Sequence, residues 1–407
     1  MDVQYFSHLN GLTLGNNWGD LIRLLDKALV TGIDFTSITA ASIDAQGDVH
    51  ITLYAAHNAM LFQVVELSGF VPASLNQKYR IKGVPSATQL ILKPHTAIVE
   101  TSITTVGTAR LASLGYEIIF RDTNDVKRVY RAKNPTAQHP FIRVDETISD
   151  GTNTYTSTYA KSAMVGLLSS MEHIDDFENP DVLQLPMDVT NLKKNWTLSG
   201  TGLNNTRGWS KWYWACSQGM PTGPFEYDAP SAGNRSFTLI GDSDAFYLVR
   251  SLINSSTNNK LLSGCGLFNE TLEGLSCPNW FLMATNKITN AGSTSGGFVF
   301  IDSGTPLVFD ALKASFMVTR YDAVNQVQNH VIAAPLLPDL STGYSDIYSG
   351  VSIGALEIPF VDSVKKLRGT LKHIFYSGNA RGSVQSTTPI ISDSSMFLTD
   401  YRDWETS

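Results

Sequence analysis

The stretch that decides the fold runs from Gly115 to Arg131 and reads GYEIIFR, DTND, VKRVYR. Residues 115–121 and 126–131 are strand-like runs, and the four residues 122–125 between them are turn material. Asp and Asn dominate this turn because they tolerate left-handed backbone and hydrogen-bond their own main chain. The stretch therefore predicts an antiparallel β-hairpin.

More strand-like runs precede the hairpin, separated by Gly, Pro, Asn and His. They occupy residues 50–54, 60–67, 78–82 and 89–93. Their short and regular spacing is typical of a small sandwich or barrel.

One amphipathic helix is predicted before these strands, over residues 18–29. Leu21, Leu25 and Leu29 recur there at helical spacing, together with Leu24. We expect Asn17 to be the N-cap and Gly32 to end the helix.

Strand-like runs also follow the hairpin, and no 10- to 15-residue helices alternate with them, so a parallel sheet is not expected. An acidic stretch bounded by prolines, residues 175–186, is interpreted as a linker or long loop with a domain boundary near 185. The strand-like runs after the hairpin lie at 140–145, 153–160, 162–168, 196–199, 208–214, 236–240, 245–250, 280–283, 297–301 and 315–320.

Together these patterns predict a mainly β protein with a few helices (α+β), built from several sandwich- or barrel-like modules. We expect three domains: a β-rich domain with the amphipathic helix at 1–95, a hairpin-containing domain or extension at 96–185, and a β-rich domain at 186–407. The 407-residue length agrees with two or three domains.

Composition narrows the classes of function. Charged residues make up only 16% of the chain and the net charge is -7, without any run of four Lys or Arg, which disfavours nucleic-acid binding. No secretory signal and no membrane span is expected from the pattern. Three cysteines, Cys216, Cys265 and Cys277, are interpreted as buried or idle thiols.

The most suggestive catalytic pattern is FVFIDSGT at residues 298–305, which has the strand-Asp-Ser-Gly-Thr form of aspartic proteases. Such enzymes need two carboxylates that share a proton. The only second candidate, Asp242 in IGDSD, lacks the glycine. Asp302 is therefore interpreted as part of an ordinary turn, with an aspartic-type protease kept as a minor alternative.

Two other clusters allow two interpretations each. The acidic residues Asp175, Asp176, Glu178 and Asp181 have oxygen ligands suited to Ca²⁺, but they lack EF-hand spacing and are interpreted as a solvated loop. The aromatic residues Trp209, Trp212, Tyr213 and Trp214 form either a face that stacks on sugars or part of the core.

No convergent catalytic set is found elsewhere. The eight histidines form neither HxxxH nor HxH, and Walker A and GxGxxG are missing from the sequence. We therefore predict no catalytic, cofactor-binding or metal-binding residues, no cofactor, and no enzymatic activity.

Several stretches resemble segments of tail and baseplate proteins of tailed bacteriophages, in which a strand ending in Ser-Gly leads through Leu-Asn into a second strand of a small β domain. The stretches are FQVVELSG (62–69), PASLN (72–76), YRI (79–81), YAKSAMV (159–165), MEHID (171–175) and LRGTLKHIFY (367–376). The resemblance implies a virion protein that is made in the host cytoplasm and built into a particle.

The leading hypothesis is thus a structural tail or baseplate protein, a scaffold or adaptor whose partners are other virion proteins and copies of itself. A receptor- or carbohydrate-binding tail protein with a host-surface glycan as partner is the main alternative. A head-tail connector component ranks below both.

Overall fold

A computed structural model describes residues 3–148, 159–199, most of 206–286, and separate strands between residues 315 and 398. All strand pairings in this described part are antiparallel, so the protein is mainly β with a small helical content, as predicted. No helix in it is both long and apolar enough to cross a membrane.

Two sheets pack together and form what we call the body. The first has the order β1-β17-β18-β19-β21, and the second has the order β22-β16-β12-β11-β10-β9, with β13 beside β12. Phe246 of the first sheet contacts Trp212 and Tyr116 of the second edge-on, with ring centroids 5.8 Å apart in both pairs. The strands of the first sheet are β1 Gln4–Ser7, β17 Phe237–Gly241, β18 Ala245–Ser251, β19 Lys260–Leu267 and β21 Trp280–Met283. Those of the second are β9 Tyr116–Arg121, β10 Lys127–Ala132, β11 Phe141–Asp145, β12 Lys161–Leu168, β13 Gln184–Leu185, β16 Ser210–Ala215 and β22 Thr285–Asn286.

The predicted hairpin is confirmed. Strands β9 and β10 pair with Arg121 opposite Arg128, and Asp125 in the turn has the left-handed φ of 61° that the Asp/Asn pattern anticipates. The hairpin continues into β11 and β12, so it lies within the second sheet of the body.

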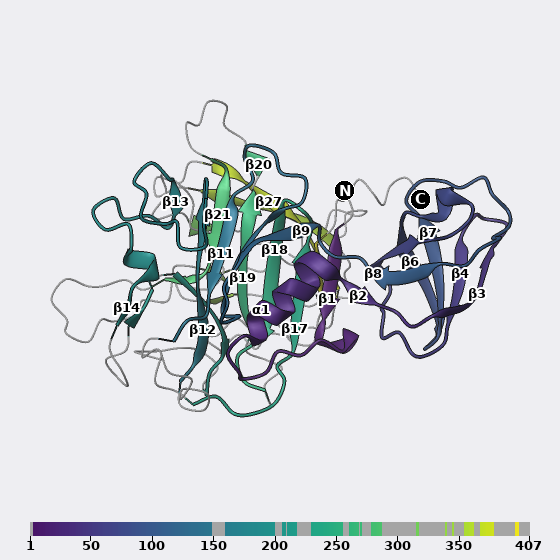
Figure 1. The fold of residues 1–407 in the computed structure, drawn as a ribbon, viewed down its shortest axis with the longest axis horizontal. Coiled ribbons are helices and arrows are strands. Elements are labelled where there is room, and N and C mark those ends of the chain that lie inside the picture. The colour runs from purple at the N-terminus through teal and green to yellow at the C-terminus, as the bar shows by residue number, and fades with distance from the viewer. Residues whose placement is uncertain are drawn as a thin grey trace, which may run out of the picture.

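The helix lies against this sheet (Figure 1). It begins as α1, Asp20–Leu25, and continues as a π-helix, Asp26–Thr31. The prediction that Gly32 ends it is confirmed, but the prediction of Asn17 as N-cap is wrong, because Gly19 holds that position. The local sequence did not show that a distant carboxylate, Glu146, satisfies the N–H groups of Gly19 and Ile22.

Residues 33–111 form a seven-stranded sheet with the order β2-β8-β5-β6-β7-β4-β3, which we call the outer module. Figure 1 shows it beside the body. Val49, Ile51 and Leu53 of β4 are buried, and the residues between them are half exposed, so this sheet covers its core with one face. Its strands are β2 Ile33–Asp34, β3 Ile38–Ile43, β4 Val49–Leu53, β5 Val64–Ser68, β6 Lys78–Ser86, β7 Gln89–Pro94 and β8 Thr108–Leu111.

The remaining described strands form small sheets. Strand β27 pairs with β20, β26 and β28, and β26 also pairs with β23; two further pairs are β14 with β15 and β24 with β25. Their bounds are β14 Leu198–Ser199, β15 Thr206–Arg207, β20 Asn269–Glu270, β23 Ser315–Phe316, β24 Pro338–Asp339, β25 Tyr344–Ser345, β26 Gly354–Val361, β27 Leu367–Ser377 and β28 Ser395–Leu398. The expected strands at 153–160 and 297–301 fall wholly or mostly outside the described residues.

The sheets do not coincide with the three expected sequence segments. Strand β1 pairs with β17, more than 200 residues later, and the second body sheet continues past residue 185 with β16. The domain boundaries at 95 and 185 stay predictions.

Candidate functional site

The tryptophan cluster belongs to the core of the body. Trp212, Tyr213 and Trp214 on β16 are fully buried, whereas Trp209 lies outside the described residues. The Trp212 indole N–H donates to the Met283 carbonyl at 2.8 Å, and Trp214 meets Trp18 edge-on at 5.8 Å. These three side chains are not exposed for stacking on a sugar ring.

The acidic cluster of residues 175–181 is divided among separate partners. Asp175 accepts hydrogen bonds from Lys127 at 2.9 Å and from Arg143 at 2.5 Å, and Glu178 pairs with Lys193. Partial burial raises the pKa of Asp175, but hydrogen bonding and the positive charges of Lys127 and Arg143 outweigh this and hold it below its usual value. Within the described ranges, no three His, Cys, Asp or Glu residues are placed to hold a metal ion.

The other predicted chemical residues have structural surroundings or fall outside the described chain. Asp242 accepts hydrogen bonds from the backbone N–H groups of Asp244 and Ala245 and so closes the β17–β18 turn. Asp302 and Cys277 lie outside the described residues. Cys216 and Cys265 are buried, as predicted, and burial raises the pKa of Cys265.

A histidine arrangement that the sequence did not reveal links two turns of the body. Nδ1 of His139 accepts the backbone N–H of Thr136 at 2.9 Å and lies 2.9 Å from its hydroxyl oxygen, while Nε2 lies 3.1 Å from Asp244. Because a backbone N–H occupies the Nδ1 lone pair, the ring is poorly placed to take a proton from the Thr136 hydroxyl. The arrangement holds turns together instead of activating a nucleophile.

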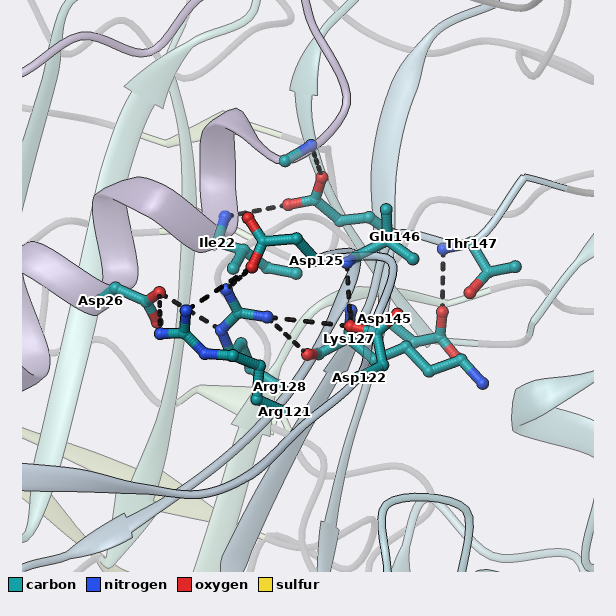
Figure 2. Close-up of polar contacts among 12 residues, drawn as sticks. Ile22, Asp26, Arg121, Asp122, Asp125, Lys127, Arg128, Asp145, Glu146 and Thr147 are labelled. Atoms are coloured by element: carbon teal, nitrogen blue, oxygen red, sulfur yellow. Dashed lines mark hydrogen bonds and ion pairs between the residues drawn. The ribbon is translucent and has the colours of Figure 1, made fainter. Parts of the chain in front are cut away.

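A polar cluster joins the helix to the hairpin (Figure 2), and we call Asp26, Arg121, Asp122, Asp125 and Arg128 the helix–hairpin network. Arg128 is 1% exposed; its Nε contacts Asp26 at 3.2 Å, and it also donates to Asp125. Arg121 contacts Asp26 at 3.4 Å but is half exposed. Burial lowers the pKa of Arg128, but Asp125 and Asp26 outweigh burial and raise it overall.

Glu146, next to this network, is fully buried. Its two carboxyl oxygens accept the backbone N–H groups of Ile22, at 2.9 Å, and of Gly19, and Figure 2 shows both contacts at the start of the helix. Burial raises the pKa of Glu146 from its ordinary 4.5 to about 8, against the lowering effect of these hydrogen bonds. This carboxyl group therefore holds the helix in place and keeps its proton at neutral pH.

Three buried side-chain amides, Gln4, Asn10 and Gln63, join the body to the outer module, and we call them the amide bracket. The Gln4 amide donates to the carbonyls of Val64 and Ala112, both at 2.8 Å, and its oxygen accepts the Val64 N–H at 2.9 Å. Asn10 and Gln63 donate to each other, at 3.0 and 2.9 Å. Because an unsatisfied buried amide is costly, this paired set favours one orientation of the module.

The neck between module and body consists of two adjacent chain segments. Ile33 pairs with Leu111 where the chain enters and leaves the module. Just before it, Gly32 has φ +70°, and an added Cβ would lie 2.1 Å from the Leu111 carbonyl oxygen. Only glycine fits this close approach. Gly32 therefore both ends the helix and allows the two segments of the neck to lie side by side.

The outer module carries most of the large apolar side chains that are exposed in the described chain. Val99 is 90% exposed and Tyr54 is 77% exposed. Val71 pairs with Thr105, the residue before Val106. The exposed apolar residues of the module are Tyr54, Leu61, Phe62, Val71, Val84, Val99 and Val106, and Leu9 and Val189 lie on the body.

Comparison of the chain with protein-family models, with curated proteins and with solved structures gave no match. The sequence contained the exposed valines, but neither their exposure nor the amide bracket had a local signal.

Proposed function

We propose that the protein is a structural component of a tailed-phage virion, a tail or baseplate scaffold or adaptor that acts through protein–protein interfaces. The observation that carries the proposal is the outer module, which exposes apolar side chains and is fixed to the body by the amide bracket and the neck. The resemblance of several stretches to phage tail and baseplate proteins supports the same role.

The junction fixes the orientation of the outer module on the body. An assembly contact is formed at low entropic cost when its surface is already held in the bound geometry. Hydrogen bonds from Gln4 to Val64 and between Asn10 and Gln63 cross the junction, and Arg80 adds a hydrogen bond to the Val3 carbonyl at 2.8 Å. A module held in this way suits a building block with fixed neighbours.

The clusters that the structure does describe perform structural tasks and favour the same proposal. The helix–hairpin network, Glu146 and His139 each connect elements that are distant in sequence. The carbohydrate-binding alternative rested on the tryptophan cluster, whose described members are buried, so no observation favours it as a second candidate.

Mass spectrometry of purified particles tests the proposal. We expect the chain in particles at a fixed ratio to the other tail proteins. The variant pair Val71→Asp with Val99→Asp should reduce incorporation about tenfold, the effect of losing roughly 1.4 kcal/mol at an interface. Val189→Asp is the matched control, because Val189 is 81% exposed on the body. Absence of the chain from particles would refute the proposal.

A further inference from the structure

The outer edge of the module sheet is open in the part of the chain that the structure describes. Strand β3, Ile38–Ile43, is the last strand in the sheet order and pairs only with β4 among the described strands. Figure 1 shows β3 on the side of the module that faces away from the body. An open edge presents backbone N–H and C=O groups to which another strand can bind.

The hydrogen bonds around β3 show which groups point outward. Asp44 donates its N–H to Asp48, and Leu53 of β4 donates to Thr88 on the opposite side of β4. Because bonding alternates along antiparallel strands, Ser42 and its partner His50 bond across the β3–β4 pair. Ala41 and Ile43 therefore direct their N–H and C=O groups to the open side.

The side chains of β3 lack the features that usually protect an edge. The strand reads ITAASI and contains neither a charged residue nor a proline. The pairing with β4 is irregular at the N-terminal end of β3, where the register shifts between Ile38 and Ala40. Residues 40–43 pair regularly with β4. Ala41 and Ile43 are half-buried and pack at the margin of the module core.

We propose that the open edge of β3 binds the same edge of a second copy of this chain, antiparallel and around a two-fold axis at Ser42. Ala41 of each copy then pairs with Ile43 of the other through four backbone hydrogen bonds, and the two module sheets become continuous. The inference rests on the proposed function in that it names one contact of the assembly.

The strand itself argues for a second copy as the partner. Around a two-fold axis at Ser42, each residue meets the one placed symmetrically in the other copy, so a charge at position 42 would lie opposite the same charge. Ser42 meets Ser42, and Asp44 meets Ala40, so no like charges are opposed. On the core side, the large Ile43 meets the small Ala41, which extends both half-covered cores across the junction.

Sedimentation of the purified full chain over micromolar concentrations tests this contact without particles. We expect a reversible self-association that Ala41→Pro weakens. The proline removes a donor that faces the open side, so the pairing with β4 is kept while two of the four intermolecular hydrogen bonds are lost. The dissociation constant should rise about 100-fold.

A charge-exchange pair tests the register. Ser42→Lys and Ser42→Glu should each raise the dissociation constant about tenfold when alone, and an equal mixture should restore association. Thr52→Lys, on the adjacent strand β4, is the matched control and should associate normally.

Equal melting temperatures would show that the variants fold. A monomeric unmodified chain, or association that Ala41→Pro and Ser42→Lys leave unchanged, would overturn the inference. The virion proposal would then still stand or fall on the particle experiment.

Discussion

The buried carboxyl of Glu146 predicts a specific pH dependence of stability. In the folded chain its pKa lies at about 8, and its ordinary value is 4.5. Between these values the folded state binds more protons than the unfolded state, so raising the pH favours unfolding. The stability that Glu146 contributes is complete below its unfolded pKa and decreases as the pH rises toward 8.

The size of the effect follows from the shift. One pKa unit corresponds to about 1.4 kcal/mol, so the full shift amounts to roughly 5 kcal/mol, of which about 2.5 kcal/mol falls between about pH 5 and pH 7. Glu146→Gln removes the titration. It also loses one of the two acceptors for Gly19 and Ile22, which lowers stability by roughly 1–3 kcal/mol at every pH.

Urea unfolding followed by tryptophan fluorescence from pH 5 to pH 8 measures the difference. We expect the free energy of unfolding of the unmodified chain to fall relative to that of Glu146→Gln as the pH rises. Glu117→Gln, an exposed position on β9, is the control and should keep the pH profile of the unmodified chain. Parallel profiles for the unmodified chain and Glu146→Gln, or a relative gain with pH, would show that the carboxylate is ionised in the fold and would refute the reasoning.

Three further predictions use the same unfolding measurement. Arg128→Met leaves Asp26 without its buried positive partner and should cost about 3–5 kcal/mol, whereas Arg121→Ala, at a half-exposed pair, should cost less than about 1 kcal/mol; equal costs would contradict the helix–hairpin network. Gly32→Ala should destabilise the neck by more than about 2 kcal/mol and speed proteolysis there, and an unchanged cleavage rate would contradict it. Trp212→Ala should cost about 3–5 kcal/mol as a core deletion, which a cost near zero would disprove.

The strand content and the hairpin could be predicted because their signals are local. The Asp/Asn turn at 122–125 lies between two strand-like runs, and Gly32 follows a periodic leucine pattern. Strand β3 was missed because ITAASI contains small and hydroxyl residues in place of a clear alternation. Strand β1 was missed because its partner β17 is remote in the sequence.

The candidate site was much less predictable. Sequence patterns drew attention to Asp302 and the tryptophans, whereas the structure assembles Glu146, Arg128 and the amide bracket from segments that are far apart. A buried polar residue has no period or spacing of its own, because its role is set by the partner that tertiary folding brings to it.

The sequence by itself determined the β class, the hairpin, the helix end at Gly32 and the balance of charge, since each depends on neighbouring residues or on composition. Only the tertiary structure decided that Trp212 and Trp214 lie in the core, and that Glu146 caps a helix more than 100 residues away. It also decided that Gln63 joins the outer module to the body. Burial and hydrogen-bond partners are properties of the packed chain, and they control whether a side chain is structural, titratable or open to a partner.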